Sequence, residues 1–125
     1  MFELLTEQLF FESTETGDIT GEKYQGTFEV RKVLTPTQKA QADKIRRDFL
    51  GNPSIGESID TETAELAFAI GQMQVRVIKS PKWYQESNNL KNFVDSNILI
   101  ELVNKVIEVE LNFKKSIRDK AEKAK

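Results

Sequence analysis

The pattern of apolar and polar positions divides the chain into one β segment and three helical segments. From Lys23 to Val33, apolar residues alternate with polar ones, as in a strand with one buried face. Later segments, at about residues 36–50, 61–79 and 96–120, repeat apolar residues every three or four positions, which places them along one side of a helix. The sequence therefore predicts a mainly α, α+β fold: a three-helix domain with a short β-strand or hairpin.

Each predicted helix begins at a local capping signal. Residues 35–38 (Thr-Pro-Thr-Gln) combine a capping box with a proline at the first helical position. Gly51 follows the end of this helix, where a left-handed residue is favoured. Asp60 or Thr61 caps the second helix, and Asp95 is the expected N-cap of the third.

The joint between the second and third helices holds the single tryptophan of the chain. Pro81 prevents a continuous helix there, because it lacks an N–H donor and clashes with the preceding turn. Two interpretations of the aromatic pair that follows stay open. The pair can cover the corner between two packed helices, or it can anchor a partner protein. The candidate partner-binding residues at this joint are Pro81, Lys82, Trp83 and Tyr84.

Residues 1–17 are predicted to form an N-terminal apolar arm or a short helix, ahead of a single domain over residues 18–125. Their large apolar side chains are too many to leave in water, so they must pack on this domain or on a partner. The candidate partner-binding residues of this segment are Phe2, Leu5, Leu9, Phe10 and Phe11. A single strand is not stable alone. Residues 18–21 are the expected hairpin partner, giving a β-hairpin over 18–34, and a neighbouring subunit is the alternative.

Composition limits the chemistry that the chain can perform. Its 125 residues, 38% hydrophobic and 30% charged, suit one folded domain. The absence of cysteine and histidine removes disulfides, thiolate catalysis, the usual general base and the commonest transition-metal ligand. We therefore expect no catalytic residues, metal site or cofactor. No apolar run reaches the ~18–20 residues that span a bilayer, so no membrane contact is expected.

Charge gives two further hypotheses. Lys79, Lys82 and Lys91 beside the aromatic pair form a sparse version of a single-strand nucleic-acid patch. The formal net charge of −2 argues against nucleic-acid binding in general. The ends of the chain differ in sign: residues 1–22 hold six acids, and residues 114–125 have a net charge of +4. Such ends suit head-to-tail contacts between copies, or they are two solvated termini.

Acidic residues provide two candidate sets for a hard cation. One set is Asp43, Asp48 and Glu57, and the other is Asp60, Glu62 and Glu65. Neither has the alternating acids and central glycine of an EF-hand loop. Helix capping explains the second set, so no metal site is predicted from either.

Five short segments follow one another in order over about residues 21 to 113. They are residues 21–31 (GEKYQGTFEVR), residues 34–36 (LTP), the helix end from Arg46 to Gly51, residues 76–84 (RVIKSPKWY) and the restart from Leu90 to Leu102. Their order and spacing resemble those of the tail assembly chaperones, and related small morphogenesis proteins, of tailed bacteriophages. One departure is that Trp-Trp pairs are common in such proteins, whereas this chain has Trp83-Tyr84.

The resemblance implies a non-enzymatic protein in the cytoplasm of an infected bacterium. Its partners would be other phage tail or virion proteins, chiefly the helical tape-measure protein and tail-tube subunits, with no nucleic acid or membrane involved. Binding would use helix-groove contacts and the N-terminal arm. Two alternatives remain. One is a structural virion protein, such as a connector, neck or decoration subunit, that forms a homo-oligomer through its arm. The other is a regulator of a host protein.

Overall fold

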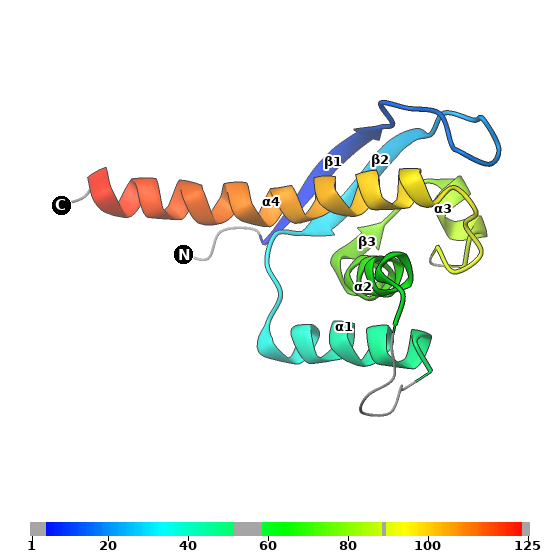
Figure 1. The fold of residues 1–125 in the computed structure, drawn as a ribbon. Coiled ribbons are helices and arrows are strands. Elements are labelled where there is room, and N and C mark those ends of the chain that lie inside the picture. Colours follow the sequence, from blue (N-terminus) through cyan, green and yellow to red (C-terminus); the bar gives the residue numbers. More distant parts are fainter. Residues whose placement is uncertain (1–4, 52–58, 89, 124–125) are drawn as a thin grey trace.

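The computed structural model describes residues 5–51, 59–88 and 90–123 (Figure 1). These residues form four helices and one three-stranded antiparallel sheet, so the mainly α, α+β class is confirmed. The elements in chain order are β1 (Thr6–Glu12), β2 (Gln25–Arg31), α1 (Pro36–Phe49), α2 (Thr61–Arg76), β3 (Val77–Lys79), α3 (Lys82–Glu86) and α4 (Ser96–Lys123). The three predicted long helices are present, and the short α3 is an addition to them.

The sheet has the order β1-β2-β3, and its longest pairing joins β1 to β2. The predicted hairpin over 18–34 is wrong, because residues 18–20 form a turn and β2 pairs with Thr6–Glu12 instead. The short helix considered for the N-terminal segment is not formed in its described part either, where Thr6–Glu12 is a strand. In the observed register Leu9 lies opposite Phe28 and Phe11 opposite Gly26, so apolar side chains of both strands share the core face.

Local capping signals set the observed helix starts. Thr35 and Gln38 form both hydrogen bonds of the predicted capping box. Asp60 caps α2 by accepting from the N–H of Thr63. Gly51 has φ +77°, as expected for the residue after a helix end.

The predicted second helix, over 61–79, is too long. It ends at Arg76, because Val77–Lys79 leave the helix to pair with β2 as β3. This pairing places β2 at the centre of the sheet, between β1 and β3. Val77 lies opposite Val30, and the register shifts between Glu29 and Val30.

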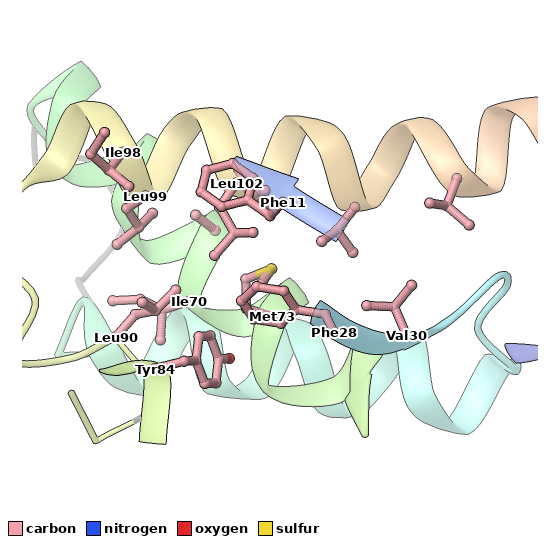
Figure 2. Close-up of a cluster of buried hydrophobic side chains, with 14 residues drawn as sticks. Phe11, Phe28, Val30, Ile70, Met73, Tyr84, Leu90, Ile98, Leu99 and Leu102 are labelled. Carbon is pink, nitrogen blue, oxygen red and sulfur yellow. The ribbon is translucent and has the colours of Figure 1, made fainter. Parts of the chain in front are cut away.

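Helix α4 crosses one face of the sheet, and α2 lies between α4 and α1 (Figure 1). Figure 2 shows side chains of α4 meeting those of α2 and the sheet in one apolar cluster. The largest fully buried apolar side chains of this cluster are Phe11, Phe28, Val30, Met73, Leu90, Ile98, Leu102 and Val106. Burial of this kind stabilises a fold by about 25 cal/mol per Å² of apolar surface removed from water. The packing of α4, α2 and the sheet against one another therefore depends on this cluster.

The C-terminal half of α4 extends beyond the sheet (Figure 1). Val109 is the last buried residue of this helix. Leu111 and Ile117 follow it with 59% and 44% of their surface exposed. The projecting part therefore carries apolar side chains without covering them within the described chain.

Candidate partner-binding surfaces

The structure divides the predicted N-terminal contact residues between surface and core. Phe2 lies outside the described residues. Leu5 and Phe10 are 49% and 60% exposed, and Leu9 is half-buried. Phe11 is a core residue, because the period of two along β1 turns it toward α4, and only 1% of its surface remains accessible. In the folded chain Phe11 is therefore not free to contact a partner.

The tryptophan of the joint packs against the start of β2. Its ring centroid lies 5.0 Å from that of Tyr24 and 5.9 Å from that of Phe28, and its Nε1 donates a 2.9 Å hydrogen bond to the carbonyl of Gln25. Gly26 faces Pro81 so closely that an added Cβ would lie 2.7 Å from the proline ring. Trp83 therefore packs at the joint against β2 and the residue before it, and partner binding through its exposed part stays a prediction.

The other residues of the joint differ in exposure. Tyr84 is buried, and burial raises the pKa of its hydroxyl far above the ordinary value. As a core residue Tyr84 is not available to a partner, because it lies beneath Phe28 and Trp83. Lys82 is exposed, and its Nζ lies 3.8 Å from Oε1 of Glu86. Pro81 is half-buried. The exposed part of the joint is small.

The two predicted contact sets do not form one patch. β1 occupies one edge of β2, whereas β3 and the joint that follows it lie along the other edge. The residues left accessible are Leu5 and Phe10 on one side and Lys82 with parts of Pro81 and Trp83 on the other. A partner that contacts both sets would have to cross the sheet.

Asp95 has a role that the sequence did not indicate. Its side chain does not cap α4; it accepts hydrogen bonds from the backbone of Ile19 and Thr20, the hydroxyl of Thr20 and the hydroxyl of Tyr24. Burial alone would raise the pKa of this carboxyl, but the hydrogen bonds outweigh it and lower the pKa to about 2. Gly17 packs against the same carboxylate, where an added Cβ would lie 2.3 Å from it. Asp95 therefore fixes the β1–β2 loop onto α4.

A groove of about 420 Å³ runs between the edge of β1 and α4. Its lining combines apolar and charged side chains, with more acids than bases. The lining residues are Glu7, Leu9, Phe10, Phe11, Glu12, Lys105, Glu108, Val109 and Asn112. The α4 members are spaced for one helix face, but no sequence pattern places them beside residues about 100 positions earlier.

A second groove, of about 460 Å³, lies between α2 and α4. It is lined by Thr61, Ala64, Glu65, Phe68, Ile100, Val103 and Asn104. Phe68 is 44% exposed at this groove. The apolar side chains that line this groove come from α2 and α4, which suits the helix-groove mode of binding predicted from the sequence.

Several of the charged residues considered for nucleic acid and metal are in ion pairs or caps, and Glu57 lies outside the described residues. Lys79 lies 3.8 Å from Glu29, and the aromatic faces beside it are packed into the corner. Asp43 binds Arg46 and Arg47 at 2.9 and 3.0 Å; the hydrogen bond from Arg46 is the main cause of its lowered pKa. Within the described ranges, no three carboxylates are grouped in a way that could hold a metal ion.

Helices that could cross a membrane are also absent from the described part of the chain. Comparison with protein-family models, with curated proteins and with solved structures gave no match. The likeness to tail assembly chaperones therefore rests on the sequence segments alone.

Proposed function

We propose that this protein is a non-enzymatic assembly factor that binds other proteins during morphogenesis of a phage tail. The observation that carries the proposal is the open apolar edge of the sheet. β1 pairs with β2 on one side, and no other described strand pairs with its second side. Phe10 is exposed on this strand and lines the groove beside α4, and Leu5 is exposed immediately before the strand begins. Exposed apolar surface of this kind marks sites of protein contact.

The phage context of the proposal comes from the resemblance of residues 21–113. It suggests the tape-measure protein and tail-tube subunits as the partners, met in the cytoplasm of an infected bacterium. The groove between α2 and α4 and the edge of β1 suit such partner proteins in different ways. The groove between α2 and α4 offers apolar side chains to a helix, whereas the edge of β1 offers backbone groups to an extended segment.

A structural virion protein is the second candidate, and the projecting half of α4 favours it. Leu111 and Ile117 are exposed there, and the described residues 114–123 include five bases and two acids. The β1–β2 loop, near the opposite end of α4, carries the acids Glu15, Asp18 and Glu22 (Figure 1). Opposite charge at opposite ends suits head-to-tail contacts between copies that stay in the particle.

Affinity capture from cells in which the parent phage is assembling tests the proposal. We expect the tagged protein to recover a long helical tape-measure protein or tail-tube subunits, identified by mass spectrometry, and to be absent from purified mature particles. Recovery of head, portal or neck proteins together with retention in the particle would support the structural role instead. Recovery of host proteins alone would contradict both.

A further inference from the structure

We propose that the open edge of β1 is a strand-addition site for an extended segment, in a partner protein, that alternates apolar and basic residues. The inference rests on the proposed function in one respect, namely that the ligand is another protein. It adds the site, the conformation of the bound segment and its charge. Four observations support it: the direction of the backbone groups, the lack of edge protection, the groove above the edge and the sign of its charge.

The backbone of β1 has hydrogen-bonding groups that point away from β2. The N–H of Ser13 donates to the carbonyl of Tyr24 at 2.8 Å, and the N–H of Lys32 donates to the carbonyl of Leu5 at 2.7 Å. These bonds continue the register of the ladder, so the odd-numbered residues of β1 bond to β2. The even-numbered residues direct their N–H and C=O groups to the open edge. They are Thr6, Gln8, Phe10 and Glu12.

The two edges of the sheet differ in protection. β3 has three residues, its register with β2 is shifted, it ends at Lys79, and Pro81 follows closely. Short length, irregular pairing, lysine and proline are the usual means of preventing strand addition. β1 has none of these four, since its seven residues pair in an unbroken register and include neither lysine nor proline, and its only charged side chains are those of Glu7 and Glu12. Edge β1 is therefore the one open to a further strand.

The groove beside β1 has room for side chains of an added strand. Its volume is about 420 Å³, with β1 on one side and the α4 face of Lys105, Glu108, Val109 and Asn112 on the other. Side chains of a strand alternate between two faces. Every second residue of an added strand would therefore enter the groove toward Val109, which is buried, and the others would lie beside Phe10 on the open face of the sheet.

Charge decides which strand fits. The groove is lined by Glu7, Glu12 and Glu108 against the single base Lys105, and none of the four has an ion pair with another described residue. Basic side chains on the face of an added strand that enters the groove would lie beside Glu7 and Glu108 and neutralise them. β1 of a second copy would instead bring its own Glu7 and Glu12 to the same place, and like charges across paired strands are destabilising. The occupant is therefore a different protein.

Titration of the isotope-labelled full chain with two synthetic peptides tests the inference. One peptide alternates valine with lysine, and the other alternates valine with glutamate. We expect the lysine peptide to cause saturable shifts and slower amide exchange at Gln8, Phe10 and Glu12, and the glutamate peptide to cause none. Shifts confined to other surfaces, equal binding of both peptides, or no binding of either would overturn the inference.

Two variants at one position give the matched control. Gln8→Pro removes an outward N–H without touching the bonds to β2, whereas Gln8→Ala keeps that N–H. In Gln8→Pro, the loss of the backbone hydrogen bond and the added proline ring should lower the affinity for the lysine peptide by about tenfold. Gln8→Ala should change this affinity by less than about threefold. Equal affinity of both variants for the lysine peptide would contradict strand addition. A wild-type dimer that Gln8→Pro dissociates would also overturn the inference, because the occupant of the edge would then be a second copy of the chain.

Failure of this inference can be separated from failure of the proposed function. If Gln8→Pro captures the same tail proteins as the wild type, the function stands and the edge is not the site. If the lysine peptide binds β1 but no tail protein is captured from infected cells, the edge is a binding site and the proposed function is wrong.

Discussion

Tyr24 and Asp95 are 71 residues apart in the chain, and the tyrosine hydroxyl donates a 2.6 Å hydrogen bond to the aspartate. Asp95 is fully buried and precedes α4, whereas Tyr24 precedes β2 and packs against Trp83. One carboxylate therefore holds together the loop, the aromatic corner and the long helix. The hydrogen bonds that satisfy it also remove the cost of burying a charge.

Replacement of Asp95 by asparagine should destabilise the fold by about 2–3 kcal/mol near neutral pH. An amide offers an NH₂ group where the native carboxylate meets only donors, so at least one donor loses its acceptor. Urea unfolding of the Asp95→Asn variant measures this loss. Tyr24→Phe is the milder comparison and should cost about 1–2 kcal/mol, since it removes one of the four bonds.

Acid should weaken the native protein through the same carboxylate. Its pKa is lowered to about 2 in the folded state, below the unfolded value of about 4, so its stabilising contribution is complete above that unfolded value. The contribution is lost as the pH falls from about 4 toward 2. We expect the difference in unfolding free energy between wild type and Asp95→Asn to shrink over this range. A difference that stays constant would contradict the lowered pKa.

Replacement of Gly71 by alanine should destabilise the contact between α1 and α2. An added Cβ would lie 2.5 Å from the backbone carbonyl oxygen of Ala42, too close for either helix to stay in place. We expect a loss of about 1–3 kcal/mol in thermal or urea unfolding, although alanine is the better helix former by about 1 kcal/mol. Thr63→Ala, at an exposed position of α2, should change stability by less than about 0.5 kcal/mol. Stabilisation by Gly71→Ala would show that the helices do not approach so closely.

Arg76 and Glu110 form a buried ion pair between α2 and α4, with 3.1 Å between Nη2 and Oε1. Burial raises the pKa of Glu110, but Lys114 and Arg76 outweigh it and lower the pKa overall. Arg76→Ala should cost about 3 kcal/mol, because it leaves the carboxylate with only the exposed Lys114. A double-mutant cycle with Glu110→Ala should give a coupling energy of about 1–3 kcal/mol. Strictly additive losses would contradict a direct interaction.

Trp83 should contribute to stability as a corner residue. Trp83→Phe keeps an aromatic ring but loses the bond to the Gln25 carbonyl, so we expect a cost of about 1–2 kcal/mol. Trp83→Ala also empties the space beside Tyr24 and should cost about 3 kcal/mol or more. Circular dichroism follows both variants, since they lack the single tryptophan as a fluorophore. Unchanged unfolding of Trp83→Ala would mean that the side chain does not hold the corner.

Features determined by neighbouring residues were predicted well from the sequence. The capping box at Thr35 and the turn residue Gly51 act within one or two helical turns, so their signals are local. The partner of β2 was not predicted, because strand pairing depends on contacts between residues distant in sequence. Residues 18–21 are nearer to β2 along the chain and were therefore expected as its partner in place of Thr6–Glu12. The end of α2 was missed for the same reason, since β2 draws Val77–Lys79 out of the helical pattern.

The candidate site was predicted only in part. The apolar content of β1 indicated a contact surface, but which side chains face outward depends on the register with β2, which turns Phe11 inward and leaves Phe10 exposed. The role of Asp95 was hidden by its position before a helix, where an N-cap is the ordinary expectation. Its four donors come from a loop that begins about 80 residues earlier.

Paired affinity capture of the wild type, Gln8→Ala and Gln8→Pro from cells assembling the phage tests the central claim most directly. We predict that the wild type and Gln8→Ala recover the same tape-measure or tail-tube protein, and that Gln8→Pro, folded by circular dichroism, recovers about tenfold less of it. Equal recovery by all three proteins would contradict binding at the edge of β1. Recovery of no virion protein by any of them would contradict the role in tail assembly.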